Sequence, residues 1–117
     1  MAGYLTTHVL DTSRGRPAQG LEIDLFRLDG EIRRHLNTMI TNSDGQTDQP
    51  ILPKAGFEIG TYEMLFHCGA YFDAMGVPTE TPRFLDVIPI RFGMSEQMEY
   101  HVPLLISPFG YSTYRGS

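Results

Sequence analysis

Short segments in which apolar and polar residues alternate recur along the whole chain, with turn-forming residues between them. An alternation with period two places every second side chain on one face of a β-strand, so each segment can bury one face and expose the other. About seven or eight such strands at regular spacing predict an all-β fold, a sandwich of two antiparallel sheets. The clearest of them cover residues 4–12, 21–28, 32–40, 57–68, 84–92, 100–106 and 111–115.

Local residue types indicate where several of these strands lie. Asp29-Gly30 suits a tight turn and predicts an antiparallel hairpin of the second and third strands. The strand at residues 57–68 has apolar residues on both faces, which indicates a central position in a sheet. The strand at residues 84–92 contains Pro89, which indicates an edge position or a bulge. Residues 69–76, with alanine and methionine between two glycines, predict one short helix and no other.

Composition limits the possible partners. A chain of 117 residues is most simply one domain, and a net charge of −5 with interspersed acids and bases leaves no basic patch for nucleic acid. No apolar run approaches the roughly 18 residues that span a membrane, and no signal segment opens the chain. Cys68 has no partner for a disulfide and fits a reducing compartment. We therefore expect a cytoplasmic protein that binds neither nucleic acid nor membranes.

Two histidines lie on the outward faces of their predicted strands. In residues 100–106 the alternation turns His101 away from the core, and in residues 4–12 it does the same for His8. A turn at residues 107–110 leads into the last strand, residues 111–115, and completes a C-terminal hairpin. This last strand is aromatic, poor in charge and at an edge, so we expect another subunit to cover it.

Three motifs along the chain are characteristic: Leu5-Thr-Thr-His-Val-Leu-Asp-Thr12, Thr41-Asn-Ser-Asp-Gly45 and Gly110-Tyr-Ser-Thr-Tyr-Arg-Gly-Ser117. Together they resemble the 5-hydroxyisourate hydrolases, the transthyretin-related enzymes of urate breakdown. The resemblance covers residues 1–117 as a single domain. It implies a transthyretin-like sandwich of two four-stranded sheets, assembled as a homotetramer (a dimer of dimers) with active sites in a channel where dimers meet.

The resemblance also implies a reaction without a cofactor. Water opens a cyclic amide of the small-molecule substrate 5-hydroxyisourate and gives 2-oxo-4-hydroxy-4-carboxy-5-ureidoimidazoline. The implied catalytic residues are His8, His101 and Ser117, and the implied substrate-binding residues are Gln46, Tyr114, Arg115 and Gly116. Histidine suits the proton transfers because its ordinary pKa of about 6.5 lies near working pH. The sequence leaves open which histidine is the base.

Gln46 departs from the family pattern, because an arginine usually follows Asp-Gly in the middle motif. A glutamine amide donates hydrogen bonds but carries no charge, unlike a guanidinium group. Either Gln46 only orients the substrate ring, or Arg115 supplies the cation, or activity is reduced. The alternatives to an active hydrolase are therefore a catalytically impaired homologue and a transthyretin-like carrier of small ligands.

The other ionisable residues carry no motif. The histidines at positions 8, 35, 67 and 101 lack the spacing of metal ligands, and the single thiol has no second thiol nearby, so we expect no metal site. His35 and His67 are expected to be surface or capping residues. Asp11 and Asp48 are expected to be solvated charges.

Overall fold

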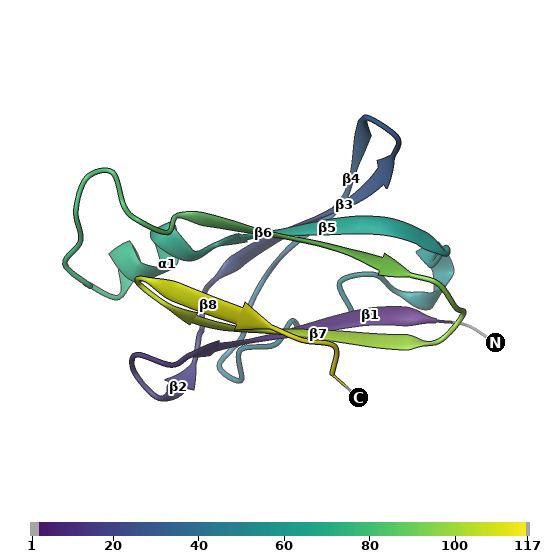
Figure 1. The fold of residues 1–117 in the computed structure, drawn as a ribbon. Coiled ribbons are helices and arrows are strands. Elements are labelled where there is room, and N and C mark those ends of the chain that lie inside the picture. Colours follow the sequence, from purple (N-terminus) through teal and green to yellow (C-terminus); the bar gives the residue numbers. More distant parts are fainter. Residues whose placement is uncertain (1–2, 117) are drawn as a thin grey trace.

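The computed structural model describes residues 3–116 and consists of two four-stranded β-sheets packed face to face (Figure 1). One sheet has the order β2-β1-β7-β8 and the other the order β4-β3-β5-β6. This confirms the predicted all-β sandwich. The strands are β1 (Tyr4–Asp11), β2 (Arg16–Pro17), β3 (Glu22–Asp29), β4 (Ile32–Ile40), β5 (Gly60–His67), β6 (Val87–Met94), β7 (Glu99–Ser107) and β8 (Gly110–Thr113).

The pairing of β1 with β7 is parallel, with Leu5 opposite Tyr100 and Val9 opposite Leu104. The expectation of antiparallel strands throughout is wrong for this pair. Parallel neighbours need a long connection, and here the whole second sheet lies between the two strands in the sequence, so no local pattern reveals their direction. The parallel register places Thr6 directly beside His101 on the outer face of the sheet.

The core fills the space between the two sheets. In β1 the alternation predicted from the sequence is confirmed, because Leu5, Thr7 and Val9 are buried and the residues between them are half-buried. Strand β5 is central and has consecutive buried residues, as predicted. Side chains of both sheets contribute to the core, among them Leu5, Val9, Ile23, Leu25, Met64, Phe66, Leu104 and Ile106.

The edges and connections also follow local sequence signals. Strands β3 and β4 form the predicted hairpin, and Gly30 at its turn has a positive φ of 64°. Strand β6, which contains Pro89, lies at a sheet edge. The predicted helix is α1 (Cys68–Ala74), and a 3₁₀ turn, η1 (Lys54–Gly56), is an addition that the sequence did not predict. Within residues 3–116, no helix is long and apolar enough to cross a membrane.

Asp11 is fully buried, so the expectation that it is a solvated charge is wrong. It continues the inward-facing alternation of β1, and donors from two neighbours satisfy its carboxylate. The Tyr71 hydroxyl donates to Oδ2 at 2.8 Å, and the hydroxyl of Ser13 donates to Oδ1 at 2.6 Å. Burial and the hydrogen bond to this carboxylate raise the pKa of Tyr71 to about 12. Asp48, in contrast, is exposed as expected.

Candidate active site

A cavity of about 1070 Å³ lies over the outer face of the β1–β7 pair. Residues of both strands, including Thr6 and His101, form its floor. The loop after β4 forms one wall, because Gln46 pairs with His8 through an isolated β-bridge beside β1. The C-terminal segment forms the other wall, where Gly116 pairs with His101 in the same way. Segments from the start, the middle and the end of the chain therefore meet at one place.

The two outward-facing histidines are neighbours. The ring centroids of His8 and His101 are 6.5 Å apart, with an angle of 33° between the ring planes. His101 lines the cavity, and His8 lies next to it. The Nδ1 atom of His101 is 2.8 Å from the Thr6 hydroxyl oxygen, which fixes the orientation of the ring. Burial, and secondarily the nearby His8, lower the pKa of His101, so its imidazole is neutral at neutral pH.

The C-terminal segment crosses the His101 ring at a glycine. The Gly116 N–H donates to the His101 carbonyl oxygen at 2.8 Å. A Cβ atom on Gly116 would lie 2.6 Å from Cδ2 of the imidazole, closer than two carbons can approach, so this contact requires glycine. The preceding Arg115 lies on the cavity wall, where its guanidinium carbon is 4.7 Å from the centre of the Tyr100 ring. This cation–π contact orients the only arginine that lines the cavity within residues 3–116.

Hydrogen bonds hold the loop that carries Gln46 against β1. The Val9 N–H donates to the Gly45 carbonyl at 2.8 Å, and the Asn42 N–H donates to the Gln46 carbonyl at 2.7 Å. Gly45 has a positive φ of 75°, and a Cβ there would lie 2.4 Å from the Val9 carbonyl oxygen. The exposed Gln46 side chain lines the cavity, as does Lys54 from η1.

Of the residues predicted from the sequence, Gln46, His101, Arg115 and Gly116 all line this cavity, and His8 adjoins it. Tyr114 does not join them. It is exposed and lines a second, smaller cavity of about 250 Å³ with residues of β6 and with Arg115, which borders both cavities. Ser117 lies outside the described residues.

Sequence reasoning missed several residues that line the site, among them Thr6 and Lys54. Thr6 precedes His8 by two positions in β1 and therefore lies on the same outward face, so the strand alternation could have predicted that Thr6 is near the site. Lys54 is far from every motif, and only the folding of its loop against β1 brings it to the cavity.

The fold and this polar, histidine-containing cavity define a small β-sandwich protein of the transthyretin-like class. Residues 5–116 match the HIUase/Transthyretin family, and the chain belongs to that family.

The similar proteins include hydrolases that match over their whole length. The 5-hydroxyisourate hydrolase 2 of Rhizobium meliloti (strain 1021) is 57% identical over 117 residues, which cover 99% of this chain and 98% of that protein. Among solved structures, the Klebsiella pneumoniae 5-hydroxyisourate hydrolase has a TM-score of 0.81 and 32% identity, over 97% of this chain and 99% of that one. An (S)-allantoin synthase structure has a TM-score of 0.92 and 45% identity, but the match covers 99% of this chain and only 44% of that longer chain.

Proposed function

We propose that this chain, as a single domain, is a hydrolase that opens a cyclic amide of 5-hydroxyisourate in urate breakdown. Water attacks the amide carbonyl carbon, the carbon–nitrogen bond breaks and the departing nitrogen takes a proton. The product is 2-oxo-4-hydroxy-4-carboxy-5-ureidoimidazoline. The observation that carries this proposal is the pair of imidazoles, with centroids 6.5 Å apart, at the cavity that the C-terminal segment lines. Its similarity to hydrolases over their full length supports it.

We assign His101 as the general base. In the tautomer that we assign, Nδ1 of His101 donates to the Thr6 hydroxyl oxygen, and the Thr6 hydroxyl donates its hydrogen to the Tyr100 carbonyl, 3.4 Å away. The ring proton then resides on Nδ1, 2.8 Å from the Thr6 oxygen, and the lone pair on Nε2 is free to take a proton from water. The lowered pKa of His101 keeps this lone pair available at neutral pH. His8 then protonates the departing nitrogen.

A cation stabilises the negative charge that develops on the substrate, and Gln46 supplies none. Arg115 and Lys54 both line the cavity, and both side chains are basic. We assign both to stabilising the tetrahedral intermediate and Gln46 to orienting the ring by hydrogen bonds. Gly116 keeps the tail against His101. Ser117 remains a predicted catalytic residue. Tyr114 remains a predicted substrate-binding residue, and it can contact only a substrate that is bound in the site of a neighbouring protomer.

The proposed active form is a homotetramer, a dimer of dimers, in the cytoplasm. The site lies on the outer face of a sheet, so a second protomer is needed to cover it and to exclude bulk water. Strands β6 and β8 are sheet edges, and Tyr111 on β8 is exposed. Pairing of these edges between protomers protects their free backbone groups.

A carrier of apolar ligands is the weaker candidate. Its binding cavity needs apolar walls, whereas Gln46, Lys54, His101 and Arg115 line this one.

Ultraviolet absorbance of freshly generated 5-hydroxyisourate tests the proposed reaction. The wild-type chain should accelerate the decay, and His101→Asn should reduce kcat/KM by roughly 100-fold or more because the base is lost. Gln46→Arg serves as a second variant: a large gain in kcat/KM would show that the missing cation limits this chain, and an unchanged rate would show that Arg115 and Lys54 suffice. No acceleration by the wild type would exclude the hydrolase.

A further inference from the structure

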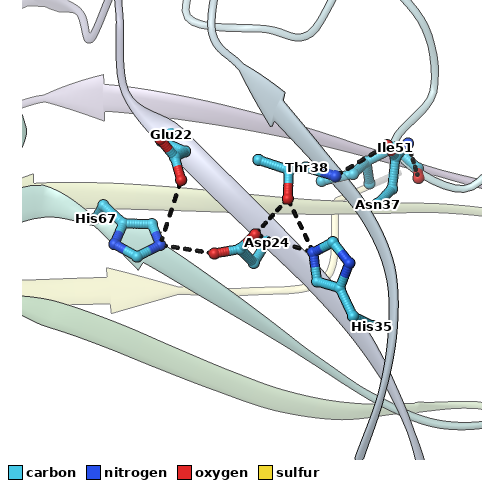
Figure 2. Close-up of polar contacts among 7 residues, drawn as sticks. All are labelled: Glu22, Asp24, His35, Asn37, Thr38, Ile51 and His67. Atoms are coloured by element: carbon cyan, nitrogen blue, oxygen red, sulfur yellow. Dashed lines mark hydrogen bonds and ion pairs between the residues drawn. The ribbon is translucent and has the colours of Figure 1, made fainter.

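Polar side chains gather around the Asp24 carboxylate on the outer face of the other sheet, away from the proposed active site (Figure 2). Glu22 and Asp24 are two residues apart on β3 and therefore share a face, opposite the buried Ile23. His67 joins them from the end of β5, and His35 joins them from β4. Three strands thus bring two carboxylates and two imidazoles together.

We propose that Glu22, Asp24 and His67 bind a divalent transition-metal ion and that Zn²⁺ matches the site best. The His67 Nε2 atom is 2.8 Å from Asp24 Oδ2 and 3.9 Å from Glu22 Oε2, and one ligand atom from each of the three residues lies within 4.8 Å of the others. Zinc bonds of about 2.1 Å in a tetrahedron separate ligand atoms by roughly 3.4 Å. Small side-chain rotations therefore convert the observed arrangement into a metal site with one open position for water.

The other carboxylate oxygen of Asp24, Oδ1, already contacts two neighbouring side chains. His35 Nε2 lies 3.0 Å from Oδ1, the Thr38 hydroxyl donates to the same oxygen, and these two neighbours are 2.8 Å apart. These contacts leave Oδ2 directed at His67, whose Nε2 atom also lies near Glu22, as Figure 2 shows. Partners of this kind orient a metal-binding carboxylate and raise the affinity of its site. His35 is therefore a positioning residue, outside the ligand set.

The chemistry of the donor set favours a transition metal over Ca²⁺ or Mg²⁺. An imidazole nitrogen is a good ligand for zinc, whereas Mg²⁺ and Ca²⁺ prefer to be coordinated by oxygen atoms alone. The Asp24 and His67 side chains are largely shielded from solvent, with exposed fractions of 18% and 29%, and Glu22 closes the site from the solvent side with 50%. A bound cation also neutralises two carboxylates that face each other.

This inference revises the expectation of no metal site. That expectation used linear spacing, but His67 is 43 residues from Asp24 and meets it only because β3 and β5 pair. The site is independent of the hydrolase proposal, since its residues lie on the other sheet.

Calorimetric titration of the full-length, chelator-treated protein with Zn²⁺ alone tests the proposal. We expect one ion per protomer and a rise in the unfolding temperature of about 5 °C or more at saturation. His67→Gln and Asp24→Asn should abolish binding, and His35→Gln should weaken it by roughly 10- to 100-fold. Glu31→Gln, which removes an exposed carboxylate from the β3–β4 turn at the far end of the hairpin, is the matched control and should bind as the wild type does.

The two active-site imidazoles are the rival zinc ligands, so the double variant His8→Asn/His101→Asn belongs in the same titration. Binding that persists in this variant and is lost in His67→Gln supports the site at Asp24. Binding that is lost in the double variant and kept in His67→Gln overturns it, as does a wild type that takes up no zinc. Far-ultraviolet circular dichroism confirms that each variant is folded, and His35→Gln, which keeps all three ligands, tests the proposal if a ligand variant fails to fold.

Discussion

His101 is the residue on which the proposed chemistry depends most. It lies beside Thr6 because β1 and β7 are parallel, and its Nδ1 atom contacts the Thr6 hydroxyl. Its pKa is lowered first by burial and then by the charge interaction with His8. A base with this environment is favoured in its neutral form.

This lowered pKa predicts how activity depends on pH. As pH falls, His101 takes up a proton and loses the lone pair that activates water, so kcat/KM should decrease at acid pH. Because its pKa is lowered, the midpoint should lie below the ordinary value of about 6.5. Initial rates between about pH 5 and pH 8, corrected for uncatalysed decay, measure this midpoint. A rate that shows no decrease down to the acid end of this range would contradict the assignment of His101 as the base.

The contact between Gly116 and His101 gives a second prediction at a single residue. In Gly116→Ala the new Cβ would lie 2.6 Å from the imidazole, so the ring or the tail must move. We expect kcat/KM to fall roughly 10- to 100-fold, because small displacements of catalytic groups are costly. The unfolding temperature should change little, since this residue adds little to the core.

Gly110→Ala is the matched control for that substitution. The nearest atom to a Cβ at Gly110 is the Ser107 hydroxyl oxygen at 3.8 Å, an ordinary contact. Steady-state kinetics and thermal unfolding of both variants separate a local effect on His101 from a general effect on the C-terminal hairpin. Equal activity in the two variants would contradict the close contact.

Among the secondary-structure elements, α1 is attached to β1 through the buried pair of Tyr71 and Asp11. Tyr71→Phe removes a donor from a fully buried carboxylate and should lower the free energy of unfolding by about 1–3 kcal/mol. Urea denaturation measures this change. Tyr111→Phe on the exposed part of β8 is the control and should stay within about 0.5 kcal/mol of the wild type. A Tyr71→Phe variant as stable as the wild type would mean that Ser13 alone satisfies Asp11.

Elements defined by local chemistry were predictable from the sequence, and contacts between distant elements were not. The turn at Gly30, the edge position of β6 with Pro89 and the alternation in β1 each depend on neighbouring residues. The parallel pairing of β1 with β7 depends on the path of the entire chain. Asp11 is an intermediate case, because the same alternation that buries Val9 also places Asp11 inward, although its charge suggested a surface position.

The residues of the candidate site also fall into a group that the sequence predicted and a group that it did not. His8, Gln46, His101, Arg115 and Gly116 were identified through motifs, and the structure brings the last four into one cavity with His8 beside them. Lys54 and the cluster around Asp24 have no motif and became visible only when the loop and the strands were folded.

For the whole molecule, the core between the two sheets is too small to enclose a substrate site, and this explains why the candidate site lies on an outer face. The side chains of two small sheets fill the space between them, so polar chemistry is confined to the outer faces. One outer face carries the two imidazoles, and the opposite one carries the proposed metal site. The proposed assembly of protomers over the first face would enclose a substrate that a single chain of this size leaves open to solvent.

The most direct test of the account is whether His8 and His101 act together in one reaction on 5-hydroxyisourate. His8→Asn, His101→Asn and the double variant should be compared with the wild type by the rate of substrate decay. We expect each single substitution to lower kcat/KM by roughly 100-fold or more and the double variant to be little slower than the worse single variant, because groups that serve one proton-transfer sequence are not additive. Single variants as fast as the wild type, or losses that simply multiply in the double variant, would contradict it.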